Sequence, residues 1–175
     1  GMVYIRGARA DYDGWEQELG CSGWGWDNVQ SYFMKSEGYS GAPSQTHSTT
    51  GLLGVAPPRS VHPLSQAFVA ACTEHGLRAV SDYCEGDIDG AFINLLTQRD
   101  GQRSSAARAF LETALKRPNL TVLTEAMADK VLIENGRAVG VQYLRERQVQ
   151  TVRARREVVV SASSFQSPAI LMRSG

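Results

Sequence analysis

The feature that most constrains the fold is a series of short β-branched runs and tight turns in the last third of the chain. Asn135-Gly136 is a dipeptide preferred in two-residue β-hairpin turns, and it lies between two runs of strand-like composition. The predicted strands are residues 120–124, 128–134, 138–144, 150–155 and 158–161. We therefore expect a β-meander that ends in a strand just before the C-terminal tail.

The tail, residues 157–175, continues this last predicted strand into small residues and then an apolar segment. Ser163 and Ser164 lie among the small residues, and residues 169–172 have a helix-like pattern after Ser167-Pro168. Nucleotide-binding α/β domains use such a passage, from a buried strand into a helix start, to bring backbone close to a ligand. The tail therefore indicates one wall of a nucleotide site.

Two helices are predicted near the N-terminus, residues 11–20 and 29–37. The turn between them contains Trp24 and Trp26, which we expect to pack between the two helices. The expected caps are Asp11 or Asp13 for the first helix and Asp27 for the second, and the expected buried stripe of the second is Val29, Tyr32 and Phe33.

The middle of the chain mixes further helices with short strands. The predicted elements are a strand over 51–55, a helix over 64–75 with Phe68, Val69 and Cys72 inside, a strand over 91–98 and a helix over 106–116. His62, just before Pro63, is expected to cap or pack at the start of its helix. The whole pattern predicts an α+β fold: a helical cover segment, a β-meander and part of a mixed sheet.

Charge and hydropathy exclude several classes of protein. Eighteen basic and eighteen acidic residues are spread along the chain, so no basic excess indicates a nucleic-acid partner. No segment approaches the roughly 20 apolar residues of a membrane span, and no signal peptide is visible. These observations predict a cytoplasmic protein that binds neither nucleic acid nor membrane.

The sequence predicts no metal site and no disulfide framework. The three cysteines lack CxxC spacing, and a reducing compartment is the default expectation for such thiols. Four carboxylates fall within residues 82–89, but the glycine and glutamate positions of a calcium-binding EF-hand loop are absent. Calcium binding there is the less favoured alternative.

Several short motifs occur together over nearly the whole chain. They are GMVYIRG (1–7), GWGW (23–26), KSE (35–37), HPL (62–64), GQRSSAA (101–107), RPNLTV (117–122), RAVGV (137–141) and the serine-proline pair at 167–168. In this order and spacing, the sequence resembles the central part of the glucose-methanol-choline (GMC) family of FAD-dependent oxidoreductases, nearest to choline and alcohol dehydrogenases.

The resemblance implies an FAD site and a division into functional segments. Gly1 and Met2 would pass beside the flavin ring, the backbone of Ala128 would contact the adenine, and Ala162 and Ser163 would run past the ribose and phosphates. The implied segments are 1–50 as a flavin-covering helical segment, 51–116 as part of a substrate-side lobe and 117–175 as part of the FAD-binding lobe.

The sequence departs from the family pattern in ways that bear on activity. The family has Ala-Gly where this chain has Ala162-Ser163, so a serine side chain could crowd the cofactor or require a positive φ. The GxGxxG phosphate-binding turn is absent, and none of the three histidines matches the family's catalytic base. We therefore assign no catalytic residue, and we expect the isolated chain to be inactive and to bind no FAD.

Two functions remain open from the sequence. The first is part of an FAD-dependent alcohol dehydrogenase or oxidase that transfers a hydride from a small, choline-like alcohol to flavin, as the resemblance implies. The second is a non-catalytic α+β module that associates with itself or with a partner. Apolar faces left uncovered by absent neighbouring elements would favour a homo-oligomer, with a homodimer expected.

Overall fold

The computed structural model describes all 175 residues, which form two compact units. The N-terminal unit spans Gly1–Pro118 and the C-terminal unit spans Asn119–Gly175. Each unit mixes helices with strands, and the predicted α+β class is confirmed. None of the helices combines the length and the apolar character that a membrane span requires. The three functional segments inferred from the resemblance stay a prediction.

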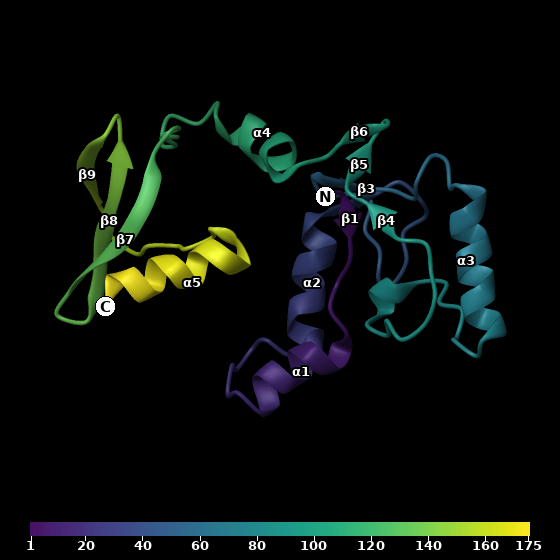
Figure 1. Cartoon of the computed structure of the whole chain (residues 1–175). Helices are drawn as coiled ribbons and strands as arrows, with labels where there is room; N and C mark the ends of the chain where they lie inside the picture. The colour runs from purple at the N-terminus through teal and green to yellow at the C-terminus, as the bar shows by residue number, and fades with distance from the viewer. The chain divides into compact units, whose positions relative to one another are not determined.

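Two helices of the N-terminal unit, α1 (Arg9–Gln17) and α2 (Trp26–Ser36), pack against each other (Figure 1). Asp13 Oδ1 accepts the backbone N–H of Trp26 at 2.9 Å, so a residue of the first helix caps the start of the second. Asp27, the predicted cap, lies instead in the first turn of α2. The prediction of Asp27 was wrong because the capping carboxylate belongs to Asp13, in the preceding helix.

The aromatic residues expected between α1 and α2 are only partly buried. Trp26 has no exposed surface, and its ring centroid lies 5.8 Å from that of Tyr12. Trp24 is 56% exposed and Tyr32 is 69% exposed, so the expectation of burial is wrong for both.

Short strands join distant parts of the N-terminal unit in pairs. The antiparallel pairs are β1 (Val3–Tyr4) with β4 (Leu95–Leu96) and β5 (Gln98–Arg99) with β6 (Gln102–Arg103). The parallel pair is β2 (Glu37–Tyr39) with β3 (Leu53–Val55). A 3₁₀ turn, η1 (Tyr83–Glu85), precedes β4 in the chain. The strand predicted over 91–98 is therefore interrupted. It breaks at Thr97, whose backbone N–H donates to the carbonyl of Met2 at 2.7 Å.

The core of the N-terminal unit is a small cluster of buried side chains, Tyr4, Val55, Tyr83 and Cys84. The Tyr83 hydroxyl donates to the backbone carbonyl of Tyr4 and accepts the backbone N–H of Leu95 at 2.8 Å. One buried phenol thus ties β1 and β4 to the turn that carries it. These bonds keep the polar end of the ring satisfied inside an apolar cluster.

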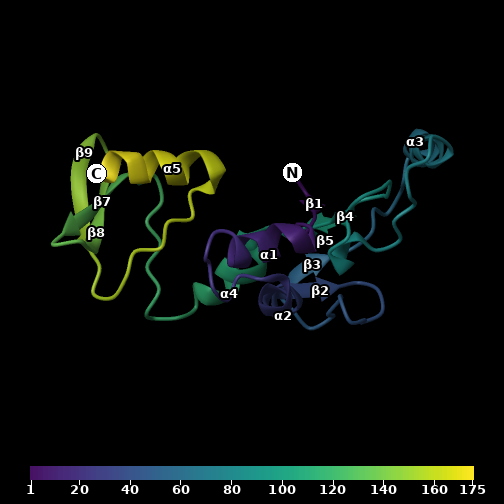
Figure 2. The same ribbon diagram turned by 90° about the horizontal axis from the view of Figure 1, so that it is seen from below.

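Helix α3 (Pro63–Glu74) stands apart from the other helices of its unit in both views (Figures 1 and 2). His62 Nδ1 accepts the backbone N–H of Leu64 at 3.2 Å, which confirms the predicted cap. No residue of α3 is buried, however, and Phe68 is 70% exposed although it was predicted to lie inside. The sequence placed an apolar stripe correctly on a helix, but the stripe lines an open cavity and none of its residues is buried.

The helix predicted over 106–116 is shorter than expected. A π-helical turn, η2 (Ala107–Leu111), runs into a single helical turn, α4 (Glu112–Ala114). Ala109, which is buried, is the only core residue of this segment. The wider π-helical turn shortens the regular helix from its N-terminal end.

The C-terminal unit is the predicted meander with a helix packed on its first strand. It contains β7 (Met127–Glu134), β8 (Arg137–Arg145), β9 (Gln148–Arg153) and α5 (Ser163–Ser174) (Figure 1). Asn135 and Gly136 have φ of +52° and +74°, both left-handed as a type I′ hairpin turn requires. Ile170 of α5 and Val131 of β7 are the buried pair of this unit.

Two predicted strands are wrong: residues 120–124 and 158–161 pair with no other strand. Val159, in the second of these segments, is 77% exposed. A β-branched run becomes a strand only where a neighbouring strand accepts its backbone hydrogen bonds. The outer edges of β7 and β9 pair with no further strand, and residues 158–161 do not join either of them.

Ser163, at the start of α5, has φ of +68°. This is the positive φ that replacing glycine with serine at this position was expected to require. A left-handed conformation costs an ordinary residue roughly 1–2 kcal/mol. The Ser163 side chain is exposed, so no buried contact offsets this strain.

We predict that Ser163→Gly stabilises the C-terminal unit by about 1 kcal/mol, because glycine adopts positive φ without steric cost. The matched control is Ser164→Gly, one residue further into the helix, which should destabilise the unit by about 0.5–1 kcal/mol. Native-state hydrogen exchange of the β7 and β8 amides measures both free energies. Equal destabilisation by the two substitutions would show that residue 163 is not strained.

Candidate functional site

Gly1 and Met2, expected beside a flavin ring, lead directly into β1. The Met2 carbonyl accepts two bonds from Thr97, one from the backbone N–H at 2.7 Å and one from Oγ1 at 3.2 Å. The Met2 side chain is 36% exposed, and Gly1 is exposed. The backbone of this segment is therefore held in place while its outer face stays free to contact a ligand.

A buried arginine anchors the chain just after β1. Arg6 is only 2% exposed, and its Nη1 donates to the backbone carbonyl of Thr46 at 2.8 Å. Its Nη2 lies 3.2 Å from Oε2 of Glu37, which has no exposed surface. Its Nε donates to the Tyr4 hydroxyl at 3.2 Å. A buried guanidinium is tolerated only with such partners, because an unpaired charge in the interior is strongly unfavourable.

A histidine extends this ion pair to a second carboxylate. His47 is 6% exposed, its Nδ1 lies 3.0 and 3.1 Å from the two carboxylate oxygens of Glu37, and its Nε2 lies 3.3 Å from Oδ1 of Asp82. The Tyr39 ring stacks on the imidazole at 4.2 Å between centroids. We call Arg6, Glu37, His47 and Asp82 the buried charge network.

The two carboxylates set the protonation of the imidazole. Burial acts to lower the pKa of His47, but the hydrogen bond and negative charge of Glu37, together with the charge of Asp82, outweigh burial and raise the pKa above its usual value. Burial also raises the pKa of the nearby Cys84 to about 12. The network therefore favours an imidazolium between two carboxylates, next to a neutral thiol.

A cavity of about 690 Å³ lies between α3 and the edge formed by β1 and β4. Most of its lining is apolar, with Val3, Phe68 and Phe92 on its walls and Asn94 as one of few polar groups. Val3 directly follows Met2, so this cavity adjoins the segment expected beside the flavin. Its size and apolar lining suit a small organic molecule.

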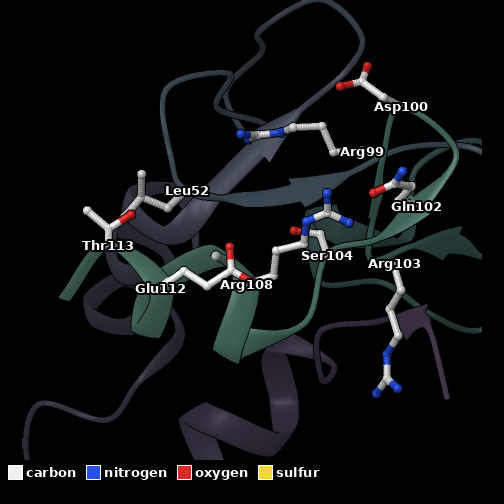
Figure 3. A pocket seen from close by; sticks show the side chains of 10 residues that line it. Leu52, Arg99, Asp100, Gln102, Arg103, Ser104, Arg108, Glu112 and Thr113 are labelled. Carbon is white, nitrogen blue, oxygen red and sulfur yellow. The ribbon is translucent and has the colours of Figure 1, made fainter. Parts of the chain in front are cut away.

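A second cavity, of about 370 Å³, is lined by charged groups of β5, β6 and the turns that follow (Figure 3). Arg99, Arg108 and Glu112 face this cavity (Figure 3). The guanidinium of Arg103 points away from the guanidinium groups of Arg99 and Arg108 (Figure 3). Arg99 Nη2 also donates to the Gly51 carbonyl at 3.3 Å. No histidine lines this cavity, and its carboxylates are those of Asp100 and Glu112.

The remaining predicted site residues belong to the C-terminal unit. Ala128 is exposed in β7 and pairs with Tyr143 beside a β-bulge, whereas Ala162 and Ser163 form the start of α5. The opposite end of α5 contacts β7, where Ser174 Oγ accepts the Val131 N–H at 2.8 Å. Ala128 and Ser163 therefore lie at opposite ends of a twelve-residue helix, about 18 Å long.

The structure does not gather the residues predicted in the C-terminal unit into a single pocket, and it places Gly1 and Met2 in the other unit. The roles of these residues toward FAD stay a prediction.

Comparison with known proteins decides the family. The sequence model described as GMC oxidoreductase matches residues 1–175, the whole chain. The chain belongs to the GMC oxidoreductase family. It is 43% identical over 175 residues to the oxygen-dependent choline dehydrogenases of Rhizobium rhizogenes (strain K84) and of Sinorhizobium fredii (strain NBRC 101917). These alignments cover 100% of this chain and 32% of each relative, so the chain spans about a third of their length.

Solved structures of GMC-like oxidases have the same fold over this region. The structure of pyridoxine 4-oxidase from Mesorbium loti matches 99% of this chain and 34% of its own length, with a TM-score of 0.86 and 32% identity. An FAD-dependent oxidoreductase from Chaetomium thermophilum matches 99% of this chain and 32% of its own, with a TM-score of 0.87 and 29% identity. The resemblance inferred from the motifs is confirmed.

Sequence reasoning missed the buried charge network. Arg6 and Glu37 were noticed only as letters of family motifs, and Asp82 only as one of four carboxylates in an acidic turn. His47 was not singled out. Charged residues next to predicted core strands were a signal that could have found them. No short sequence motif, however, indicates which of these residues contact one another.

We predict that Glu37→Gln lowers the free energy of unfolding of the N-terminal unit by about 3–5 kcal/mol, because it leaves Arg6 buried without its counter-charge. The matched control is Glu85→Gln at an exposed carboxylate, which should change stability by less than about 0.5 kcal/mol. Urea unfolding followed by tryptophan fluorescence measures the difference, since all three tryptophans lie in this unit. A loss below about 1 kcal/mol would show that the ion pair contributes little.

Proposed function

We propose that this chain forms the flavin-covering part and a portion of the substrate side of an FAD-dependent alcohol oxidoreductase. The supporting observation is the 43% identity to oxygen-dependent choline dehydrogenases along the entire chain. By its relatives' names, the substrate is a small alcohol of the choline type. Bound FAD would supply the acceptor for a hydride leaving the alcohol carbon.

The residues present fit the edges of an FAD site but not a complete one. Gly1 and Met2 offer an exposed, anchored backbone beside an apolar cavity, and Ala128 offers exposed strand backbone. Ser163, by contrast, places a side chain in a left-handed position where the family pattern has only a hydrogen. The chain also lacks the GxGxxG turn that binds the pyrophosphate. We therefore derive no step of the reaction through the cofactor.

The part of the chemistry that this chain can perform is positioning. Thr97 fixes the backbone of Met2, and the buried charge network fixes the segment that follows. Val3 and Phe92 supply part of the apolar lining of the cavity. His62 Nδ1 is engaged in capping α3, and His47 is enclosed between two carboxylates. His62 also lines the apolar cavity, and we assign no residue of this chain as the base for the hydroxyl proton.

We predict that the purified chain retains no FAD after gel filtration, because the pyrophosphate-binding turn is absent and Ser163 obstructs the tail. Visible flavin absorption of the eluted protein measures retention. At a large excess of FAD, we expect weak amide chemical-shift changes at Met2, Ala128 and Ala162. Stoichiometric flavin after gel filtration would contradict the inactive-chain proposal, and shifts confined to other residues would contradict the proposed flavin-facing role.

A second candidate function, a self-associating module, is favoured by the apolar surface of the tail. Phe165 is 85% exposed, Met172 is 84% exposed and Val159 is 77% exposed. Large apolar side chains so exposed favour association between copies. We propose a homodimer formed through this surface, and we expect the double variant Phe165→Ser/Met172→Ser to shift it to monomer in light scattering. A wild-type chain that stays monomeric at high concentration would contradict this candidate.

A further inference from the structure

We propose that His47, Asp82 and Cys84 form a binding site for a divalent transition-metal ion, with zinc the ion that the donors favour. One imidazole nitrogen, one carboxylate oxygen and one sulfur converge from two separate loops of the N-terminal unit. Zinc binds this mixture of nitrogen, oxygen and sulfur ligands in tetrahedral sites. The inference is independent of FAD and of the proposed oxidoreductase function.

The distances suit a tetrahedral ion. The three donor atoms lie within 4.8 Å of one another, and Nε2 of His47 lies 3.3 Å from Oδ1 of Asp82. Zinc–ligand bonds of roughly 2.0–2.3 Å at tetrahedral angles place neighbouring donors about 3.3–3.7 Å apart. The nitrogen–oxygen edge already has this length. Rotation about the Cα–Cβ bond of Cys84 adjusts the position of the sulfur, and the fourth position is left for a water molecule.

The surrounding groups orient the donors as they do in known metal sites. Glu37 accepts from Nδ1 of His47 at 3.0 and 3.1 Å, which directs Nε2 toward Asp82. A carboxylate behind a histidine is a frequent outer partner of zinc ligands. Asp82 is fixed as well, since it accepts bonds from Thr46 Oγ1 at 2.9 Å and from the backbone N–H of Cys84 at 2.8 Å.

Charge explains why a cation is tolerated beside a buried arginine. The ion and Arg6 together carry three positive charges. Glu37, Asp82 and the Cys84 thiolate carry three negative charges, while His47 is neutral as a ligand. On binding, the thiol proton and the Nε2 proton of His47 pass to solvent, and a sulfur–metal and a nitrogen–metal bond form in their place. No oxidation or reduction takes place.

This site could not be predicted from the sequence because its donor residues are far apart in the chain. His47 precedes Asp82 by 35 residues, and Cys84 has no second cysteine at metal-binding spacing. The carboxylates of residues 82–89 were weighed only as a calcium loop. The structure selects one of them, Asp82, and adds a nitrogen and a sulfur, a donor set that favours zinc over calcium.

The test uses Co²⁺ as a spectroscopic probe, on the full chain after treatment with a chelator. We expect one equivalent of Co²⁺ to give a near-ultraviolet thiolate-to-cobalt charge-transfer band, which Zn²⁺ then abolishes by displacement. The decisive variant is Cys21→Ser/Cys72→Ser, which leaves Cys84 as the only thiol and changes nothing in the site. This variant should keep the full band.

Single substitutions then assign the other two donors. His47→Gln and Asp82→Asn should each weaken Co²⁺ binding at least tenfold, whereas His75→Gln and Asp87→Asn, at exposed positions, should leave it unchanged. The absence of a thiolate band in the folded wild-type chain would overturn the proposal and leave a purely structural charge network. Loss of the band in Cys21→Ser/Cys72→Ser would overturn it equally, by assigning the metal to another thiol.

Discussion

The N-terminal unit depends on the ion pair between Arg6 and Glu37. Both side chains are almost completely enclosed, and the groups that satisfy them come from loops far apart in the sequence, at Thr46 and Cys84. The apolar core next to this pair is small, built on four buried side chains. Where so little apolar surface is buried, the correct closure of a charged network specifies how the strands and loops meet.

The C-terminal unit is organised by different forces. Hairpin turns set the register of its three strands, and one helix covers part of the first strand through Ile170 and Val131. Much of the other surface of that helix is apolar and exposed. Two kinds of unit therefore share one chain: one specified by long-range polar contacts, the other by local turn chemistry and a single layer of packing.

This difference explains what the sequence could predict. The meander over β7 to β9 and its Asn135-Gly136 turn follow from local chemistry, and the structure confirms them. The positive φ at Ser163 was one of two consequences expected from the family pattern, and the structure shows it. The strand over 158–161 and the burial of Phe68 failed because each needs a partner element that the chain does not provide. The charge network was invisible for the opposite reason, since its partners exist but lie tens of residues apart. The family motifs identified the fold, but they indicated neither the missing partner elements nor the contacts within the charge network.

The pairing of β1 with β4 has a consequence for synthesis on the ribosome. The bond that holds Met2 comes from Thr97, 95 residues later in the chain. At roughly 5–20 residues per second, the first strand waits on the order of 5–20 seconds after it is made before its partner emerges. During the first part of that interval the Arg6 side chain also lacks Glu37 and Thr46, which follow it in the chain. The beginning of this unit is therefore among the first parts to be translated and among the last to fold.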